Sequence, residues 1–104
     1  MNAVRKNSAA QLEEHATQAA AILKQLANPV RLQILCQLIG GDKSVGEISK
    51  GIDLSQSALS QHLAKMREAG LVEAEKRGQM VYYRIVDMRA HALFSTLYLI
   101  FCKD

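Results

Sequence analysis

Two cysteines, Cys36 and Cys102, carry the most reactive side chains in this sequence. A thiolate can take part in disulfide exchange if the sulfur is accessible and a usable fraction of it is ionised. Two cysteines can equally be small buried hydrophobic residues, and two sulfurs alone favour a metal site only weakly. The sequence has no Cys-x-x-Cys and no plausible base beside either thiol. It therefore argues against a thiol oxidoreductase, and we expect no enzymatic activity.

The histidines and acidic residues do not form a metal-binding pattern. His15, His62 and His91 have no mutual ligand spacing. Asp87 and His91 together would make a poor zinc site without further ligands. We expect no metal and no cofactor, and a metal-responsive protein stays open as an alternative.

A polar helix is predicted over residues 55–70. At about 100° per residue, Leu59, Leu63 and Met66 share one face, while Ser and Gln side chains occupy the N-terminal half of the opposite face. Gln can pair with adenine through two hydrogen bonds, and Ser allows close backbone approach, so this helix could enter a DNA major groove. A merely solvated helix face is the alternative, and His62 could pack rather than contact a base. The candidate DNA-contacting residues are Ser55, Gln56, Ser57, Ser60, Gln61, His62 and Lys65.

A β-hairpin is predicted immediately after this helix. Residues 71–76 and 80–86 are short runs rich in β-branched and aromatic side chains, and a Gly-containing link separates them. The tip carries Lys76, Arg77 and Gln79. Cations there could contact phosphates, which would add affinity and salt dependence but little sequence discrimination. A solvated hairpin turn would have the same composition.

The other predicted elements complete a winged helix. A helix over 9–27 is followed by one that Asn28 caps and that ends at Gly40-Gly41. Ser44 and Glu47 form a capping box for a short helix that ends near Gly51, and this helix with 55–70 makes a helix-turn-helix. The last helix runs from Asp87 to about residue 102. We therefore expect a mainly α fold with a β-hairpin (α-α-α-α-β-β-α), with 1–8 a flexible N-terminus and 9–104 one DNA-binding and dimerisation domain.

The last helix also predicts a homodimer. Between residues 92 and 102 only Ser95 and Thr96 interrupt its apolar side chains, so one small domain cannot cover all of them. The Leu/Ala seam of the first helix is expected to join the same interface. A two-fold dimer would place two recognition helices about one DNA turn apart, on a pseudo-palindromic operator. A monomer with a larger core is the alternative. The candidate interface residues are Leu12, Leu23, Leu93, Leu97, Ile100 and Phe101.

Composition limits the classes of protein to which this chain can belong. A chain of 104 residues, 49% hydrophobic and 22% charged, suits one soluble domain, and its net charge of +3 permits DNA binding without demanding it. The N-terminus lacks the apolar segment of a signal peptide, and the longest apolar run is too short to span a membrane. We expect a cytoplasmic protein with no membrane contact. Three Tyr, two Phe and no Trp argue against a large aromatic-lined ligand pocket.

Four local sequences closely resemble the ArsR/SmtB family of repressors. They are LANPVRLQIL (26–35), LSQSALSQHL (54–63), REAGLV (67–72) and VYYRI (81–85), and the resemblance covers about residues 12–102. It implies a dimeric winged helix that leaves its operator DNA when it senses an inducer. Two metal-sensing patterns of the family do not match: the helix after Ser44 contains no Cys, and Arg89 stands where one pattern places His.

The surroundings of Cys36 and Cys102 resemble the dithiol branch of this family. By that resemblance, the two cysteines meet and respond to reactive sulfur species or oxidants. A disulfide or longer polysulfide bridge would then shift the dimer and lower its affinity for the operator. The resemblance implies a repressor of sulfide- or oxidant-detoxification genes. A metal-responsive repressor and a dimeric regulator without a thiol switch stay as alternatives.

Overall fold

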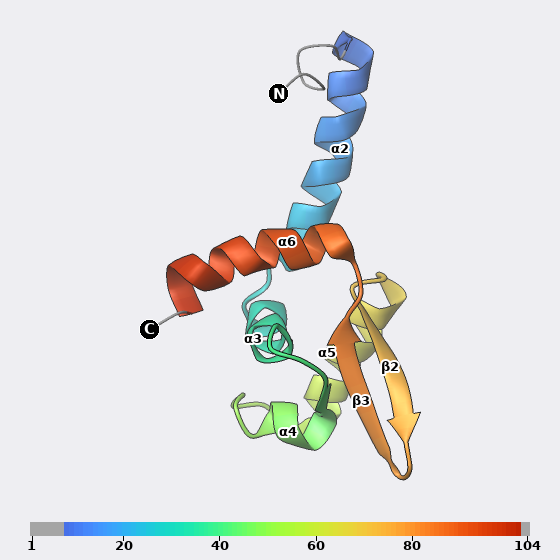
Figure 1. Ribbon diagram of the computed structural model, residues 1–104, viewed down its shortest axis with the longest axis vertical. Coiled ribbons are helices and arrows are strands. Elements are labelled where there is room, and N and C mark those ends of the chain that lie inside the picture. The colour runs from blue at the N-terminus through green and yellow to red at the C-terminus, as the bar shows by residue number, and fades with distance from the viewer. Residues whose placement is uncertain (1–7, 103–104) are drawn as a thin grey trace.

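A helical layer and a small antiparallel sheet make up the computed structural model, which describes residues 8–102 (Figure 1). Most of the predicted flexible N-terminus, residues 1–7, lies outside the described residues, as do 103–104. Ser8 forms a capping box with Gln11 at the start of the first helix. The elements are α2 (Ala9–Leu26), α3 (Pro29–Leu38), β1 (Lys43–Ser44), α4 (Val45–Ser49), α5 (Gln56–Glu68), β2 (Val72–Arg77), β3 (Met80–Ile85), α6 (Met88–Leu97) and the π-helical segment η1 (Tyr98–Cys102).

The helix-turn-helix forms where capping residues predict it. The Ser44 hydroxyl accepts a hydrogen bond from the Glu47 backbone N–H, and the Glu47 carboxylate accepts one from Ser44 N–H at 2.9 Å. The Ser44 backbone donor is the main reason that the pKa of Glu47 lies below its ordinary value. Ser55 caps α5 through its hydroxyl, and Gly70, at φ +78°, ends the helix in a conformation that favours glycine.

The first strand of the hairpin lies one residue later than the sequence predicts, and the second strand ends one residue earlier. Strand β2 extends through Arg77, and the turn uses Gly78 at φ +64°. A short strand that the sequence analysis missed, β1, pairs antiparallel with β3, giving a three-stranded sheet in the order β1-β3-β2. The added pairing joins the middle of β3 to the start of the helix-turn-helix.

The core lies where α3, α4, α5 and α6 converge. Ile34, Leu35, Ile48, Leu63 and Phe94 are among its fully buried side chains. In Figure 1, α6 crosses over α3, and α2 projects away from both. Leu26 is the one buried residue of α2. The other apolar side chains of that helix are therefore not covered by the rest of the domain.

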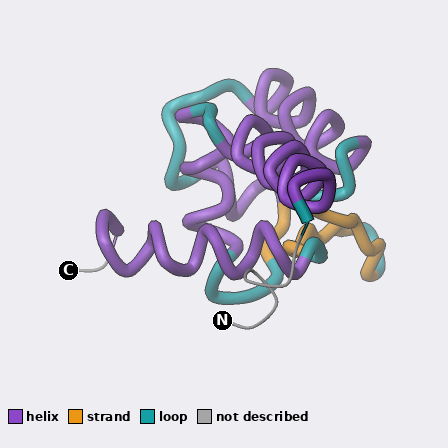
Figure 2. The backbone as a smooth tube through the Cα atoms, turned by 90° about the horizontal axis from the view of Figure 1, so that it is seen from above, coloured by secondary structure: helices purple, strands orange, loops and turns teal. Residues whose placement is uncertain are grey.

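The last helix does not stay α-helical to its end. After Leu97 it continues as η1, a π-helical turn with i→i+5 hydrogen bonding that carries Cys102. The wider turn places Cys102 at a different angle around the helix axis than an α-helical continuation would. Figure 2 shows this end of the helix extending beyond the helical layer. None of the helices within residues 8–102 has the length and hydropathy to span a membrane.

Candidate functional site

The polar face of α5 is presented to solvent. Leu59, Leu63 and Met66 are fully buried beneath it, so the core holds the helix in one orientation. The predicted contact residues on this face are exposed, and His62 is half-buried at its border. The exposed set is Ser55, Gln56, Ser57, Ser60, Gln61 and Lys65. The Ser55 hydroxyl already accepts the Ala58 N–H at 3.1 Å, which commits that oxygen to capping.

The cations of the hairpin differ in their surroundings. Lys76 and Gln79 are exposed. The Arg77 guanidinium instead forms ion pairs with Asp42 and, at 2.7 Å, with Glu75. It also lies over the Tyr82 ring, 4.6 Å from the ring centroid. Part of the positive charge at the tip is therefore balanced by acidic residues of the same chain.

Asp42 is a functional candidate that the sequence analysis missed. It lies in the loop between α3 and β1, and it pairs with both Arg77 and Arg84. Arg84 in turn contacts Glu73 across the two strands at 2.8 Å. No local pattern in the sequence indicates these contacts, because the folded loop brings Asp42 against a hairpin more than thirty residues away.

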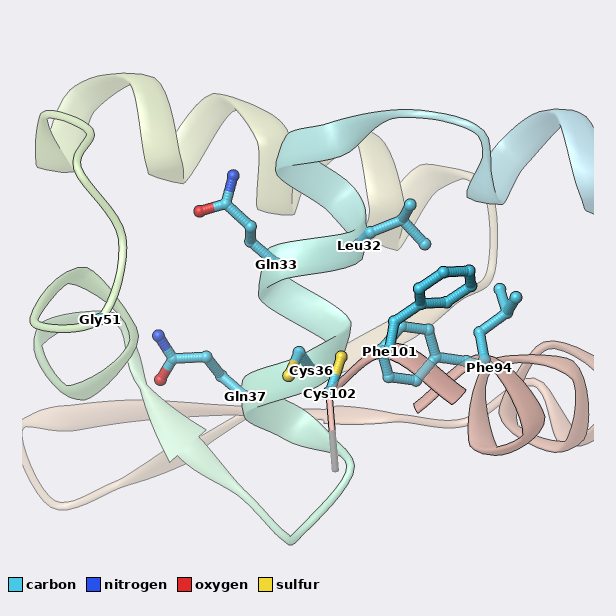
Figure 3. A pocket seen from close by; sticks show the side chains of 9 residues that line it. Leu32, Gln33, Cys36, Gln37, Gly51, Phe94, Phe101 and Cys102 are labelled. Carbon is cyan, nitrogen blue, oxygen red and sulfur yellow. The ribbon is translucent and has the colours of Figure 1, made fainter. Parts of the chain in front are cut away.

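The fold brings Cys36 and Cys102 together. Cys36 lies half-buried on α3, and Cys102 is exposed at the end of η1. Figure 3 shows the two sulfur atoms side by side, and both cysteines are reduced. Burial raises the pKa of the Cys36 thiol, and its hydrogen bond with Cys102 and the charge of that neighbour raise it further. Cys36 is thus held in the thiol form beside an accessible partner.

A cavity opens next to the two sulfurs. Its volume is about 540 Å³, and it lies between α3, the α6–η1 helix and the turn after α4. Leu32, Phe94 and Phe101 contribute apolar surface on one side, and the amides of Gln33 and Gln37 lie on the other (Figure 3). Leu97 also lines the cavity. The amino-acid composition argued against a large aromatic-lined pocket, and two of the nine residues that line this cavity are aromatic. Both phenylalanines of the chain converge on this cavity because α6 crosses α3.

Gln37 links the cavity to the helix-turn-helix. Its side-chain nitrogen donates a hydrogen bond to the Ile48 carbonyl at 3.1 Å, near the end of α4. A β-carbon at Gly51 would collide with the same amide, so any other residue at this position would displace the Gln37 side chain. A displacement of α3 would therefore act directly on the first helix of the helix-turn-helix.

Metal ligands are not gathered in the described part of the chain. No group of three or more His, Cys, Asp or Glu side chains within residues 8–102 is placed to hold a metal ion. Ser95 Oγ lies 3.4 Å from the His91 ring, and Asp87 caps α6 through its carboxylate. The two residues of the weak zinc pattern thus serve local roles in α6.

Apolar side chains are exposed on α2 and on the last helix. Leu12 and Leu23 are half exposed on α2, and Ile100 and Phe101 are 63% and 78% exposed on η1. Leu93 is also exposed, whereas Leu97 is half-buried and lines the cavity. These are the residues from which the sequence predicts a dimer interface, and within the chain they remain largely uncovered.

Comparison with known proteins places this geometry in a family. Residues 28–74 match the model of the bacterial regulatory proteins of the arsR family. The chain is 43% identical over 93 residues to the transcriptional activator HlyU of Vibrio cholerae, which covers 89% of this chain and 86% of that protein. It is 42% identical over 91 residues to the biofilm growth-associated repressor of Agrobacterium fabrum, which covers 88% and 78%.

Comparison with solved structures points to the same family as the sequence relatives. The transcriptional repressor BigR from Xylella fastidiosa superposes with a TM-score of 0.85 at 39% identity, over 91% of this chain and 94% of that one. The match includes the helix-turn-helix, the hairpin and the long terminal helices, and it confirms the predicted winged-helix fold. The chain therefore belongs to the ArsR family of winged-helix DNA-binding transcriptional regulators, in the branch that contains HlyU and BigR, and it is not an enzyme.

Proposed function

We propose that this regulator is a homodimeric repressor that reactive sulfur species or oxidants release from its operator through a Cys36–Cys102 bridge. The observation that carries this proposal is the contact between two reduced thiols that are far apart in the sequence, one on α3 and one at the end of η1. A structural pair of buried cysteines would not need one partner at an exposed helix end. The proposed target genes are those of sulfide or oxidant detoxification.

The two thiols have different roles in the proposed reaction with a persulfide. The exposed Cys102 thiolate attacks the outer sulfur of R–S–SH, so that a Cys102 persulfide forms and R–S⁻ leaves. The Cys36 thiolate then attacks the sulfur bonded to the Cys102 Cβ, and HS⁻ leaves. One persulfide and two thiols thus yield one disulfide, one R–SH and one H₂S.

A longer bridge follows from the same chemistry. If a second persulfide converts Cys36 to its persulfide first, the outer sulfur of Cys36 attacks the sulfur bonded to the Cys102 Cβ. A trisulfide forms and HS⁻ leaves, with two R–SH produced in total. The trisulfide tolerates a larger separation of the two helices than a disulfide, whose Cα atoms must lie within about 7 Å.

The bridge would act on DNA binding through α3 and η1. It joins the helix that contacts α4 through Gln37 to the helix end that carries the exposed apolar residues. In a homodimer built on those residues, a change there alters the spacing of the two α5 helices. A pseudo-palindromic operator tolerates little change in this spacing, because its half-sites are about one helical turn apart.

Base recognition is assigned to the exposed face of α5. Gln56 and Gln61 are proposed to contact base edges, Ser57, Ser60 and Lys65 to contact bases or phosphates, and Lys76 and Gln79 to contact the flanking backbone. Arg77 would first have to exchange Asp42 and Glu75 for a phosphate. The half-buried His62 is proposed to support the helix from its border.

One experiment tests the switch. The reduced protein is bound to a duplex that it selects from random sequence, and operator affinity and intact mass are followed after addition of a persulfide. We expect release together with an intramolecular sulfur link in the wild type, and retention of DNA in Cys36→Ser and Cys102→Ser. Normal release of either variant would contradict the proposal. Tight metal binding that changes operator affinity would favour a metal-responsive regulator instead.

A second experiment tests the DNA contacts. Gln56→Ala combined with Ser57→Ala should weaken operator binding about 10- to 100-fold, because base contacts carry most of the discrimination. Binding to unrelated duplex should change little. Lys50→Ala, on the cap of α4, provides a control outside this face. An equal loss on both duplexes would contradict base contact by these residues.

A further inference from the structure

We propose that the cavity beside Cys36 selects neutral persulfides with an apolar substituent over persulfides that carry carboxylates. This inference rests on the proposed function, because it names the class of sulfur donor that the thiol pair accepts. The proposal concerns which donors reach the two sulfur atoms, and the exchange reaction itself is the one described above.

The size of the cavity suits a small organic molecule. Small-molecule sites are commonly about 300–1,000 Å³ and mostly apolar, with a few polar groups that orient the ligand. This cavity, at about 540 Å³, lies within that range, and both sulfurs are in its wall. A hydropersulfide that enters it therefore brings its reactive sulfur to the thiol pair.

The lining separates into two parts. Leu32, Phe94 and Phe101 form an apolar side that can cover an aryl or branched alkyl group. Gln33 and Gln37 form the other side, where neutral amides can accept or donate hydrogen bonds to an uncharged polar group. The cysteines lie between the two sides (Figure 3).

The described residues that line the cavity include no charged side chain, since none of them is Lys, Arg, His, Asp or Glu. A carboxylate that leaves water for such a wall loses hydration without gaining an opposite charge. A donor such as glutathione persulfide bears carboxylates near its sulfur, so its approach is penalised relative to a neutral donor of similar intrinsic reactivity.

The test compares two donors on the reduced full-length protein. Benzyl hydropersulfide is the neutral probe, and glutathione persulfide is the anionic probe. Their rates of reaction with the protein are divided by their rates with the neutral thiol N-acetylcysteine amide, which removes their intrinsic reactivity. We expect this normalised preference for the benzyl donor to be about tenfold or greater, since burial of its apolar group is gained only in the cavity.

Substitutions of Gln33 make the test specific to the cavity wall. Gln33 is exposed, so Gln33→Lys and Gln33→Glu alter the wall without disturbing the core. We expect Gln33→Lys to lower the preference several-fold and Gln33→Glu to raise it. A change in thiolate fraction affects both donors and cancels in the ratio. Gln18→Lys, on exposed α2, makes the same charge change away from the cavity and should leave the ratio unaltered.

The outcomes separate this inference from the proposed function. If the normalised rates of the two donors are equal, and Gln33→Lys does not change them relative to each other, selection by the cavity is overturned even if bridging and DNA release occur. If neither donor produces a bridge, the thiol switch fails and this inference fails with it. A preference that Gln33→Lys and Gln33→Glu shift in opposite directions supports selection by the cavity wall.

Discussion

The proposed recognition helix α5 and the C-terminal segment α6–η1 both carry several large apolar side chains, but the core buries these side chains to different extents. In α5 the face of Leu59, Leu63 and Met66 is fully buried, and the opposite polar face is exposed. In η1 no residue is buried, and Ile100 and Phe101 are mostly exposed. One helix is covered by its own domain, and the other ends with its apolar side chains uncovered.

Under the proposed function, this difference separates DNA recognition by α5 from control by η1. Direct base contact requires a rigid helix, and the core supplies that rigidity to α5. A switch needs an element whose position is not fully determined by the core, and such elements come from regions of low local stability. The end of η1 meets that condition, and it carries Cys102.

The largest expected effect is on the core beneath α5. Leu63→Ala should lower the free energy of unfolding by about 2–5 kcal/mol, because it removes fully buried side-chain volume. Ile100→Ala removes exposed apolar atoms, so its cost should depend on protein concentration, as expected for a residue covered only in a dimer. Denaturant titrations at several protein concentrations measure both. A concentration-independent loss of equal size at Ile100 would contradict the contrast between the two helices.

The next effect concerns the uncovered apolar surface. Ile100→Glu should raise the dimer dissociation constant by about tenfold to a hundredfold, because a carboxylate would be buried in the interface. Sedimentation equilibrium measures this directly. Val81→Glu, at an exposed apolar position on the hairpin, serves as the control and should leave the dissociation constant unchanged. A wild-type chain that stays monomeric at high concentration would exclude this role for η1.

The third effect is the pH dependence of bridging. Because burial raises the pKa of Cys36, only a small fraction of this thiol is ionised at neutral pH. Conversion of the Cys102 persulfide to the bridge should therefore accelerate by up to about tenfold per pH unit, until the pH passes the raised pKa. Quenched-flow mass spectrometry follows this step. A rate independent of pH through the neutral and alkaline range would contradict the assigned role of Cys36.

The same pKa shift predicts a change in stability. A thiol whose pKa is raised in the folded state holds its proton more tightly there than in the unfolded chain. Its contribution to stability is therefore complete below the unfolded-state pKa and is lost as the pH rises through the folded-state pKa. In Cys36→Ser this loss should be absent, and denaturant titrations of the wild type and this variant across the alkaline pH range measure the difference.

The smallest effect is expected at the hairpin. Asp42→Asn removes one partner of Arg77 and of Arg84, so both cations become more available to phosphate. We expect a few-fold gain in affinity for operator and unrelated duplex alike, with a steeper dependence on salt. Titrations at several salt concentrations measure it, and Glu14→Gln on α2 controls for net charge. A gain confined to the operator would indicate base recognition instead of phosphate contact.

The sequence by itself determined the local elements and the face of each helix. Ser44, Ser55 and Asp87 cap helices as predicted. The buried face of α5 is the apolar face that its periodicity indicates. Capping and amphipathicity depend on residues three or four positions apart, so a single sequence contains the needed information. The order of these elements was sufficient to predict the winged-helix fold.

The tertiary structure alone decided which distant side chains meet. Periodicity contained no information on the contact between Cys36 and Cys102, which only the family resemblance implied. The pairing of β1 with β3, the ion pairs of Asp42 and the cavity between α3 and η1 were not predicted. Each depends on how helices cross and how loops close, and these arrangements are set by packing of the whole core. The candidate recognition surface is therefore largely local in origin, whereas the candidate sensor exists only in the folded chain.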